Sequence, residues 1–407
     1  MRVARCAFGV RWRPLPGTRN SERGTRNAVD SEAPLRIALN AQLLSFAETY
    51  RSGGISRVIY HLLAELGRDP RGHTFDVFVP TAPATNGWGG LTFHPSGGHT
   101  MRPAIRIVWE QTILPRELAR LGPDLLHGTA YALPVGWPGP GVVTMYDLSF
   151  LRFPNAFKPA NRIYLTATTR ATARRARRIL TISEHARRDI VRFLSVPEQR
   201  VDVAYPAAEV RYHRLPAEQV RAFRVAHDLP EVFVFAVGTL EPRKNLVGLL
   251  HAYARVRAKR PPLYVAGGVG WRFSPIFDTV RQLHLTDDVH FLGFVPEDEL
   301  PLWYNAARLF AFPSLYEGFG LPVLEAMACG TPVVTSTAAS LPEVAGKAAV
   351  LVPPQDTDRL AHEMERVLGD PQLQTEMRAA GRIQASRFSW RAMTDQTVTT
   401  YSRAVGG

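Results

Sequence analysis

Two glutamates, Glu317 and Glu325, are separated by seven residues in the segment LYEGFGLPVLEAMACG. Carboxylates act as general acids and bases, and they also accept hydrogen bonds from the vicinal hydroxyls of sugars. If both residues were helical, they would lie roughly 12 Å apart along the helix axis. A pair of carboxylates that hydrolyses a glycosidic bond needs a separation of about 5 to 9.5 Å. The spacing therefore favours two separate roles, one glutamate binding a sugar and the other a ribose.

The residues around the two glutamates predict a phosphate-binding loop followed by a short helix. Pro322 suits the first turn of a helix and Gly330 its C-terminal end, which gives a helix of about two turns. The backbone N–H groups of Phe319, Gly320 and Leu321 would then point at a diphosphate together with the positive end of the helix dipole. A single Glu is more often a solvated surface residue, but the glycine loop and the two helix signals together favour a binding site.

Basic and glycine residues at two other strand ends extend this site. Arg243 and Lys244, in VGTLEPRKNL, follow the strand that ends before Gly238 and would neutralise a leaving diphosphate. Gly53 and Gly54 lie between the first strand and the first helix, where a missing Cβ lets the backbone approach a phosphate. A plain turn and solvated basic residues are the alternatives for these segments.

Further candidates come from the first half of the chain. Tyr146 and Asp147 end a predicted strand in VVTMYDLSF, and His127 follows another in DLLHG. Ser183 precedes a predicted helix in LTISEHARRDI, where a helix N-cap is the alternative explanation. Glu110 is a further candidate for the acceptor side, as is His127, for which a buried or capping histidine is the alternative.

These motifs resemble those of the retaining glycosyltransferases of family 4, which have the GT-B fold, and the resemblance covers residues 35 to about 401. It implies two doubly wound Rossmann-like domains that face a central cleft, with the nucleotide sugar on the C-terminal domain and the acceptor on the N-terminal domain. It also implies that Arg243 and Lys244 bind the donor diphosphate. We expect no metal or other cofactor, because these two cations would do the work of a divalent ion and no Asp-x-Asp pair lies at a strand end. The family commonly has His where this chain has Tyr146, and Tyr, with a reference pKa near 10, is a poor general base at neutral pH.

Short β-rich runs alternate with helical segments from residue 35 onward, which is typical of βαβ units and parallel sheets. The predicted strands are 35–44, 75–80, 124–127, 142–146 and 178–182, then 232–237, 263–266, 289–292, 309–312, 332–335 and 349–352. The linker is predicted within residues 201–229. The expected organisation is a disordered tail or misassigned start at 1–33, domains at 34–215 and 216–387, and at 388–407 a helix that crosses back to the first domain.

Length and composition agree with a two-domain globular enzyme, because 407 residues exceed the usual size of one core and charged residues make up 21%. No apolar run approaches the roughly 20 residues that span a bilayer. Cys6 and Cys329 form no disulfide framework or metal cluster, and we expect a cytosolic setting, with peripheral attachment to the inner membrane face as a further expectation.

The formal net charge of +13 indicates an anionic partner. Arg170, Arg174 and Arg177 or Arg178 are predicted on one helical face, which would attract anionic lipid or a lipid-linked acceptor, although such runs are usually solvated. Aromatic residues that would interleave with bases are absent from this run, so nucleic acid is disfavoured. The sequence thus favours transfer of a hexose from a nucleoside-diphosphate sugar to a glycan or lipid-linked hydroxyl, with a sugar-nucleotide epimerase, a phosphorylase or a non-catalytic sugar-nucleotide-binding protein as alternatives.

Overall fold

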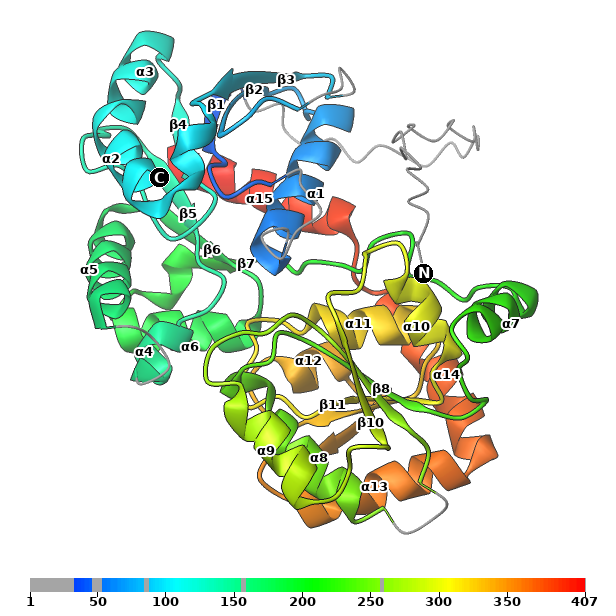
Figure 1. The fold of residues 1–407 in the computed structure, drawn as a ribbon. Coiled ribbons are helices and arrows are strands. Elements are labelled where there is room, and N and C mark those ends of the chain that lie inside the picture. Colours follow the sequence, from blue (N-terminus) through cyan, green and yellow to red (C-terminus); the bar gives the residue numbers. More distant parts are fainter. Residues whose placement is uncertain (1–32, 46–52, 84–87, 155–158, 257–259, 407) are drawn as a thin grey trace, which may run out of the picture.

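The computed structural model describes residues 33–45, 53–83, 88–154, 159–256 and 260–406, and the predicted tail at 1–32 lies outside this part. Two parallel sheets with helices between their strands form two bodies, one built from the first half of the chain and one from the second (Figure 1). The α/β architecture with two doubly wound sheets is therefore confirmed. No helix in the described ranges is both long and apolar enough to cross a membrane.

The first sheet has seven parallel strands in the order β3-β2-β1-β4-β5-β6-β7. Its strands are β1 (Arg36–Asn40), β2 (Thr74–Val79), β3 (Leu91–Pro95), β4 (Leu125–Gly128), β5 (Gly141–Thr144), β6 (Arg178–Thr181) and β7 (Val201–Val203). The helices are α1 (Gly54–Arg68), α2 (Pro103–Thr112), α3 (Leu114–Leu121), α4 (Ser149–Arg152), α5 (Pro159–Arg175) and α6 (Glu184–Leu194). The central strands are apolar on both faces because helices cover both, as parallel sheets require.

The second sheet has six parallel strands in the order β10-β9-β8-β11-β12-β13. They are β8 (Val234–Val237), β9 (Leu263–Ala266), β10 (Val289–Gly293), β11 (Leu309–Phe312), β12 (Val333–Ser336) and β13 (Val350–Val352). The helices are α7 (Ala217–Ala226), α8 (Leu246–Ala254), α9 (Ser274–Gln282), α10 (Leu300–Ala306), α11 (Leu321–Ala328), α12 (Leu341–Ala345), α13 (Thr357–Gly369) and α14 (Pro371–Ala385). Strand order reverses between β8 and β11, and ligands of such sheets bind at the carboxyl ends of the strands beside this point.

The last helix, α15 (Trp390–Val405), packs against α1 and strands β4 to β7 of the first sheet, and Figure 1 shows it crossing to that body in red. The hydroxyl of Tyr401 lies 2.7 Å from His127 Nδ1, and Arg403 donates a 2.8 Å hydrogen bond to Asp202. The ring of Trp390 stacks on His61 with 4.2 Å between centroids. Buried polar and aromatic contacts therefore fix this helix on the first sheet.

The structure corrects two details of the predicted elements. It has two edge strands that the pattern missed, β3 and β7, and the predicted strand at 35–44 ends at Asn40. The segment 201–229 contains β7 and α7, so the irregular connection is only residues 204–216. In β3 apolar and polar residues alternate, and β7 is only three residues long with Asp202 in its middle, so neither strand has the continuous apolar run that identifies a central strand.

Candidate functional site

Arg243 and Lys244 occupy a short 3-10 turn, Pro242–Lys244, that follows the carboxyl end of β8. Asn245 ends this turn in the left-handed region and donates hydrogen bonds to the carbonyls of Pro313 and Pro354, 3.1 and 2.7 Å away. The Lys244 side chain lies over Gly238, where an added Cβ would come within 3.2 Å of it. The turn therefore holds both cations at the end of the sheet where ligands bind.

Glu317 joins these two cations in one ionic cluster. Its Oε1 accepts hydrogen bonds from Lys244 Nζ at 2.6 Å and Ser314 Oγ at 2.8 Å, and its Oε2 accepts one from Arg243 at 3.0 Å. Arg243 also pairs with Glu241 at 2.8 Å. Burial alone would raise the pKa of Glu317, but the charges of Lys244 and Arg243 lower it. Burial lowers the pKa of Lys244, against the opposing effect of Glu317. The predicted diphosphate cations thus already have anionic partners in this structure.

The loop YEGFG has the conformation that a phosphate-binding turn requires. Ser340 Oγ lies within hydrogen-bond distance of the carbonyls of Glu317 and Phe319, at 2.9 and 2.6 Å, which fixes the loop. Gly320 has φ +115°, a value that favours glycine, and it precedes α11. Within the described part of the chain, no backbone carbonyl accepts from the N–H groups of Gly320 or Leu321. These donors are free for an anion at the helix start, whereas the Phe319 side chain is buried.

The end of β5 lies directly opposite this loop. A Cβ on Gly318 would come within 2.8 Å of the Tyr146 carbonyl oxygen and 3.2 Å of Asp147 Cβ, so only glycine allows this approach. Asp147 accepts a 2.9 Å hydrogen bond from the Ser149 backbone N–H. Burial would lower the pKa of Arg243, but the charges of Glu317 and Glu241 and, to a smaller extent, of Asp147 raise it. Asp147 therefore faces the cation cluster from the first sheet.

The prediction that the Tyr146 side chain does chemistry is wrong. The ring is buried in the core, and its hydroxyl donates a 2.9 Å hydrogen bond to the carbonyl of Thr129. Burial raises the pKa of Tyr146, which removes it further from any role as a base. Its backbone carbonyl lies close to Gly318 of the glycine loop.

Glu325 lies in a second ionic cluster, with no hydrogen bond or ion pair to Glu317 in the described ranges. Its carboxylate is buried, accepts a 3.0 Å hydrogen bond from Tyr304 and lies 2.7 Å from a guanidinium nitrogen of Arg57 on α1. Arg57 also donates a 2.8 Å hydrogen bond to Glu209. Burial alone would lower the pKa of Arg57, but Glu325 and Glu209 raise it. The two glutamates therefore belong to different ionic clusters.

Gly53 and Gly54 lie at the start of α1, one turn before Arg57, whose N–H donates to the Gly53 carbonyl at 3.3 Å. Both glycines are exposed, and a Cβ on Gly54 would meet nothing within 4 Å. Among the described residues, nothing occupies the space that a side chain at Gly54 would take.

Two of the acceptor-side predictions fail because the side chains serve the core. His127 has no exposed surface, and its ring nitrogens contact Tyr401 and Thr144 at 2.7 and 2.8 Å. Burial lowers the pKa of His127 to about 3, so it is neutral. Ser183 is fully buried and caps α6 by accepting from the Ala186 N–H at 3.0 Å. The alternatives of a core histidine and a helix cap are correct.

Glu110 lines a cavity of about 200 Å³ beside the ends of β1 and β4. It accepts a 3.1 Å hydrogen bond from Asn40, and Arg106 and Tyr164 line the same cavity. Burial raises the pKa of Glu110, although the positive charge of Arg106 opposes this shift. This residue is the acceptor-side candidate that the structure leaves accessible to a ligand.

The predicted basic face is smaller than expected. Arg170 and Arg174 are exposed on α5 and Arg177 is exposed just after it. Arg178 lies instead in β6 and binds Asp202 through two guanidinium nitrogens, at 2.9 and 2.6 Å. Arg178 is therefore a structural residue of the first sheet and not part of a helical surface.

Sequence reasoning missed Arg57, Tyr304, Ser314 and Ser340, which hold the two glutamates or their loop. Each is an ordinary residue in its segment, and only the three-dimensional contacts identify it. Among the residues that the structure describes, no group of three or more His, Cys, Asp or Glu side chains is placed to hold a metal ion.

Two family models match the chain. The one described as Glycosyltransferase Family 4 matches residues 52–211, and the one described as Glycosyl transferases group 1 matches residues 219–384. The chain is 36% identical over 282 residues to the O-antigen chain mannosyltransferase B of Escherichia coli, which covers 68% of this chain and 74% of that protein. It is also 34% identical over 226 residues to a serotype-specific mannosyltransferase WbdA of the same organism, covering 53% of this chain but only 27% of that protein.

Solved structures share the fold. Sucrose-phosphate synthase from Thermosynechococcus elongatus superposes with a TM-score of 0.74 at 24% identity, over 90% of this chain and 98% of that one. Anabaena Alr3699/HepE, in complex with UDP and glucose, superposes with a TM-score of 0.70 at 17% identity, over 90% and 99% of the two chains.

Proposed function

The chain belongs to glycosyltransferase family 4, and from that membership we propose that it transfers a hexose from a nucleoside-diphosphate sugar to an acceptor hydroxyl with retention of configuration. The name of the E. coli relative supports mannose as the hexose and a growing O-antigen chain or a related glycan as the acceptor. The UDP and glucose bound by the Anabaena protein support a sugar nucleotide as the donor.

The observation that carries this proposal is the contact of Lys244 with Glu317 beside the unpaired N–H groups of Gly320 and Leu321. An ammonium, a guanidinium and a helix start converge at the carboxyl end of β8, and this combination suits a diphosphate. Lys244 has three N–H donors, of which Glu317 takes one, so donors remain for a phosphate.

The reaction breaks the bond between the sugar C1 and the diphosphate oxygen, and the electron pair leaves with the diphosphate. Lys244 and Arg243 stabilise this developing charge, which is the role that a divalent ion has in other enzymes. The acceptor hydroxyl attacks C1 from the face that the diphosphate leaves, and its proton passes to a diphosphate oxygen. Configuration at C1 is therefore retained, and no protein nucleophile or cofactor is required.

The two glutamates hold the donor in this proposal. Glu317 uses one lone pair of Oε2 and both of Oε1 in the described contacts, which leaves Oε2 able to accept from a sugar hydroxyl. Glu325 accepts ribose hydroxyls next to Tyr304, either beside Arg57 or in its place. Asp147 faces the same sugar from the first sheet.

The acceptor binds on the first-sheet side, where the cavity beside Glu110 and Asn40 offers polar groups for a glycan. Arg170, Arg174 and Arg177 on and after α5 would attract an anionic membrane surface that presents a lipid-linked acceptor.

The test is product analysis with a panel of guanosine- and uridine-diphosphate hexoses and with glycan acceptors of defined length. We expect one donor to give a product whose anomeric configuration, measured by NMR coupling constants, equals that of the donor. A product of inverted configuration would refute retention. A rearranged sugar nucleotide without acceptor would identify an epimerase, and donor binding without transfer to any acceptor would identify a binding protein.

A further inference from the structure

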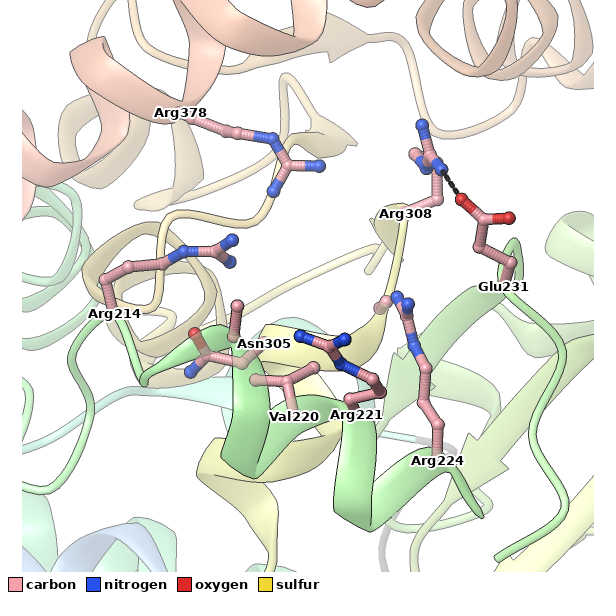
Figure 2. Close-up of a pocket in the computed structure, with 10 residues that line it drawn as sticks. Arg214, Val220, Arg221, Arg224, Glu231, Asn305, Arg308 and Arg378 are labelled. Carbon is pink, nitrogen blue, oxygen red and sulfur yellow. Dashed lines mark ion pairs between the residues drawn. The ribbon is translucent and has the colours of Figure 1, made fainter.

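Five arginines surround a second cavity, of about 500 Å³, in the body of the second sheet. They are Arg214, Arg221, Arg224, Arg308 and Arg378. Figure 2 shows their guanidinium groups arranged around an open space, with Arg221 and Arg224 rising from α7 and Arg378 coming from α14. These residues are scattered over the sequence, so only the fold brings them together.

This cavity is distinct from the donor site. Arg308 directly precedes β11 and Glu231 lies three residues before β8, so the cavity lies at the amino ends of these strands. Lys244 and Glu317 follow the carboxyl ends of the same two strands. A strand of this length spans roughly 13 Å, and the sheet therefore separates the two sites.

The charges around the cavity are not balanced. Glu231 is the single carboxylate among the lining residues, and it lies 3.8 Å from Arg308 with 83% of its side chain exposed. Within the described part of the chain, Arg214 and Arg221 have no carboxylate within ion-pair distance. Burial first, and then the charges of neighbouring arginines led by Arg214, lower the pKa of Arg378 to about 10, which is the direction expected for cations that repel one another. Such repulsion is relieved when an anion binds between them.

The deeper arginines also bind neutral groups, which hold them in place without neutralising their charge. Arg378 donates a 3.0 Å hydrogen bond to the carbonyl of Gly330, and Arg308 donates one of 3.2 Å to the side-chain oxygen of Gln374. Arg224 donates to the carbonyl of Ala306, while its buried Nε has no hydrogen-bond partner. The guanidinium groups are thus positioned before any ligand arrives, and they retain free N–H donors.

We propose that this arginine pocket, lined by Arg214, Arg221, Arg224, Arg308 and Arg378, binds a ligand that carries two or more phosphate groups. Guanidinium groups bind phosphate through paired N–H donors, and several of them around one cavity match a ligand with several phosphates. The volume is within the usual range for small-molecule sites. The ligand is either a free phosphorylated compound or the headgroup of an anionic lipid, because both present the same chemistry.

The first experiment is calorimetric titration with inorganic tripolyphosphate, using Lys244→Ala protein so that binding at the donor site is weakened. We expect one binding event, with an affinity at least tenfold lower when Arg214→Gln and Arg221→Gln are added. Both residues are exposed, so these changes should leave the thermal unfolding temperature unchanged or higher. If the double change prevents folding, Arg221→Gln alone replaces it, with an expected loss of at least threefold.

Arg281→Gln is the matched control, because Arg281 is an exposed arginine of the same body that pairs with Asp278 on α9. This variant should bind tripolyphosphate like the Lys244→Ala parent. Equal affinities of the pocket variant and the control, or no binding in the parent, would overturn the proposal. Neither result depends on sugar transfer, so failure here is distinct from failure of the proposed function.

The second experiment separates the two sources of phosphate. Wild-type protein and the Arg214→Gln/Arg221→Gln variant are sedimented with vesicles of phosphatidylcholine and cardiolipin, an anionic lipid whose headgroup carries two phosphate groups. Loss of both vesicle and tripolyphosphate binding in the variant would identify a lipid headgroup as the ligand. Loss of tripolyphosphate binding with unchanged sedimentation would identify a free phosphorylated compound.

Discussion

Arg57 on α1 lies 2.7 Å from Glu325 on α11, and the two side chains form a buried ion pair between a helix of the first body and a helix of the second. The Glu325 side chain is 2% exposed and that of Arg57 is 15% exposed. Arg57 also donates to Glu209, so one guanidinium neutralises two carboxylates where the bodies meet. The residue that we propose for ribose binding is therefore also part of the contact between the two bodies.

Replacing Arg57 by alanine should destabilise the protein by about 3–5 kcal/mol, because it leaves Glu325 buried without its cationic partner. It should also raise the KM for the donor. Urea unfolding and donor titration measure the two effects. The double variant Arg57→Ala/Glu325→Gln is the control, and it should recover most of the stability because residue 325 is then uncharged and Glu209 keeps its 2.6 Å ion pair with Arg211. Equal stability of the single and double variants would show that the pair is not coupled.

The strands of the two sheet interiors could be predicted from sequence because burial on both faces produces continuous apolar runs. The predicted strands 263–266 and 309–312 match β9 and β11 to the residue. The strands β3 and β7 escaped prediction because β3 alternates apolar with polar residues and the polar Asp202 interrupts the three residues of β7. The edge strands β10 and β13 of the second sheet were predicted, at 289–292 and 349–352.

The candidate site was predictable where backbone geometry demanded particular residues. Gly320 and Lys244 lie in loops whose glycines and turns are visible in the sequence. The same reasoning failed for Tyr146 and His127, because a residue at a strand end can point into the core as well as toward a ligand. Arg57 was missed because its partner is far away in sequence.

Replacing Lys244 by alanine should lower kcat for transfer at least a hundredfold, since loss of one preorganised charge contact costs about 2.7–4 kcal/mol in the transition state. Initial rates at saturating donor measure this effect. Lys347→Ala is the control, because Lys347 is exposed on the loop after α12 and should leave the rate unchanged. Near-normal turnover of a correctly folded Lys244→Ala protein would show that the diphosphate binds elsewhere.

Glu209 should make stability depend on pH in the acidic range. Although burial favours the neutral acid, His61, Arg57 and Arg211 lower the pKa of Glu209 to about 2. A carboxylate with a folded-state pKa below its unfolded value stabilises the protein above the unfolded pKa, and this contribution disappears as pH falls toward the folded pKa. Lowering the pKa of Glu209 from its usual value to about 2 corresponds to a contribution of roughly 3 kcal/mol to the free energy of unfolding.

The free energy of unfolding of wild type and Glu209→Gln should therefore differ at pH 6 and converge as pH approaches 2. Urea titrations at several pH values test this, with the exposed Glu218→Gln as a control that shows no such convergence. If the difference in unfolding free energy between wild type and Glu209→Gln stayed constant from pH 6 to pH 2, then Arg57 and Arg211 would not lower the pKa of Glu209 in the folded protein.

Two glycines of the proposed donor site should respond differently to alanine. Gly320 has φ +115°, and a Cβ there would lie 2.7 Å from Leu341 Cδ2, so Gly320→Ala should cost about 1–3 kcal/mol of stability. A Cβ on Gly54 would meet nothing within 4 Å, so Gly54→Ala should change stability by less than about 0.5 kcal/mol.

For Gly54→Ala, the effect on donor binding is the informative measurement, because an ordinary helix start would tolerate alanine without any effect on the donor. If the backbone at Gly54 approaches the donor phosphates, the added methyl group of Gly54→Ala will occupy their space and raise the donor KM at least tenfold. The exposed glycine Gly72→Ala is unsuitable as a control because its φ of +81° makes alanine strained, whereas Gly369, which ends α13 and also has nothing within 4 Å, is suitable. Donor KM values of Gly54→Ala and Gly369→Ala that equal that of wild type would place the diphosphate away from α1, because a methyl group cannot enter an occupied site without displacing its ligand.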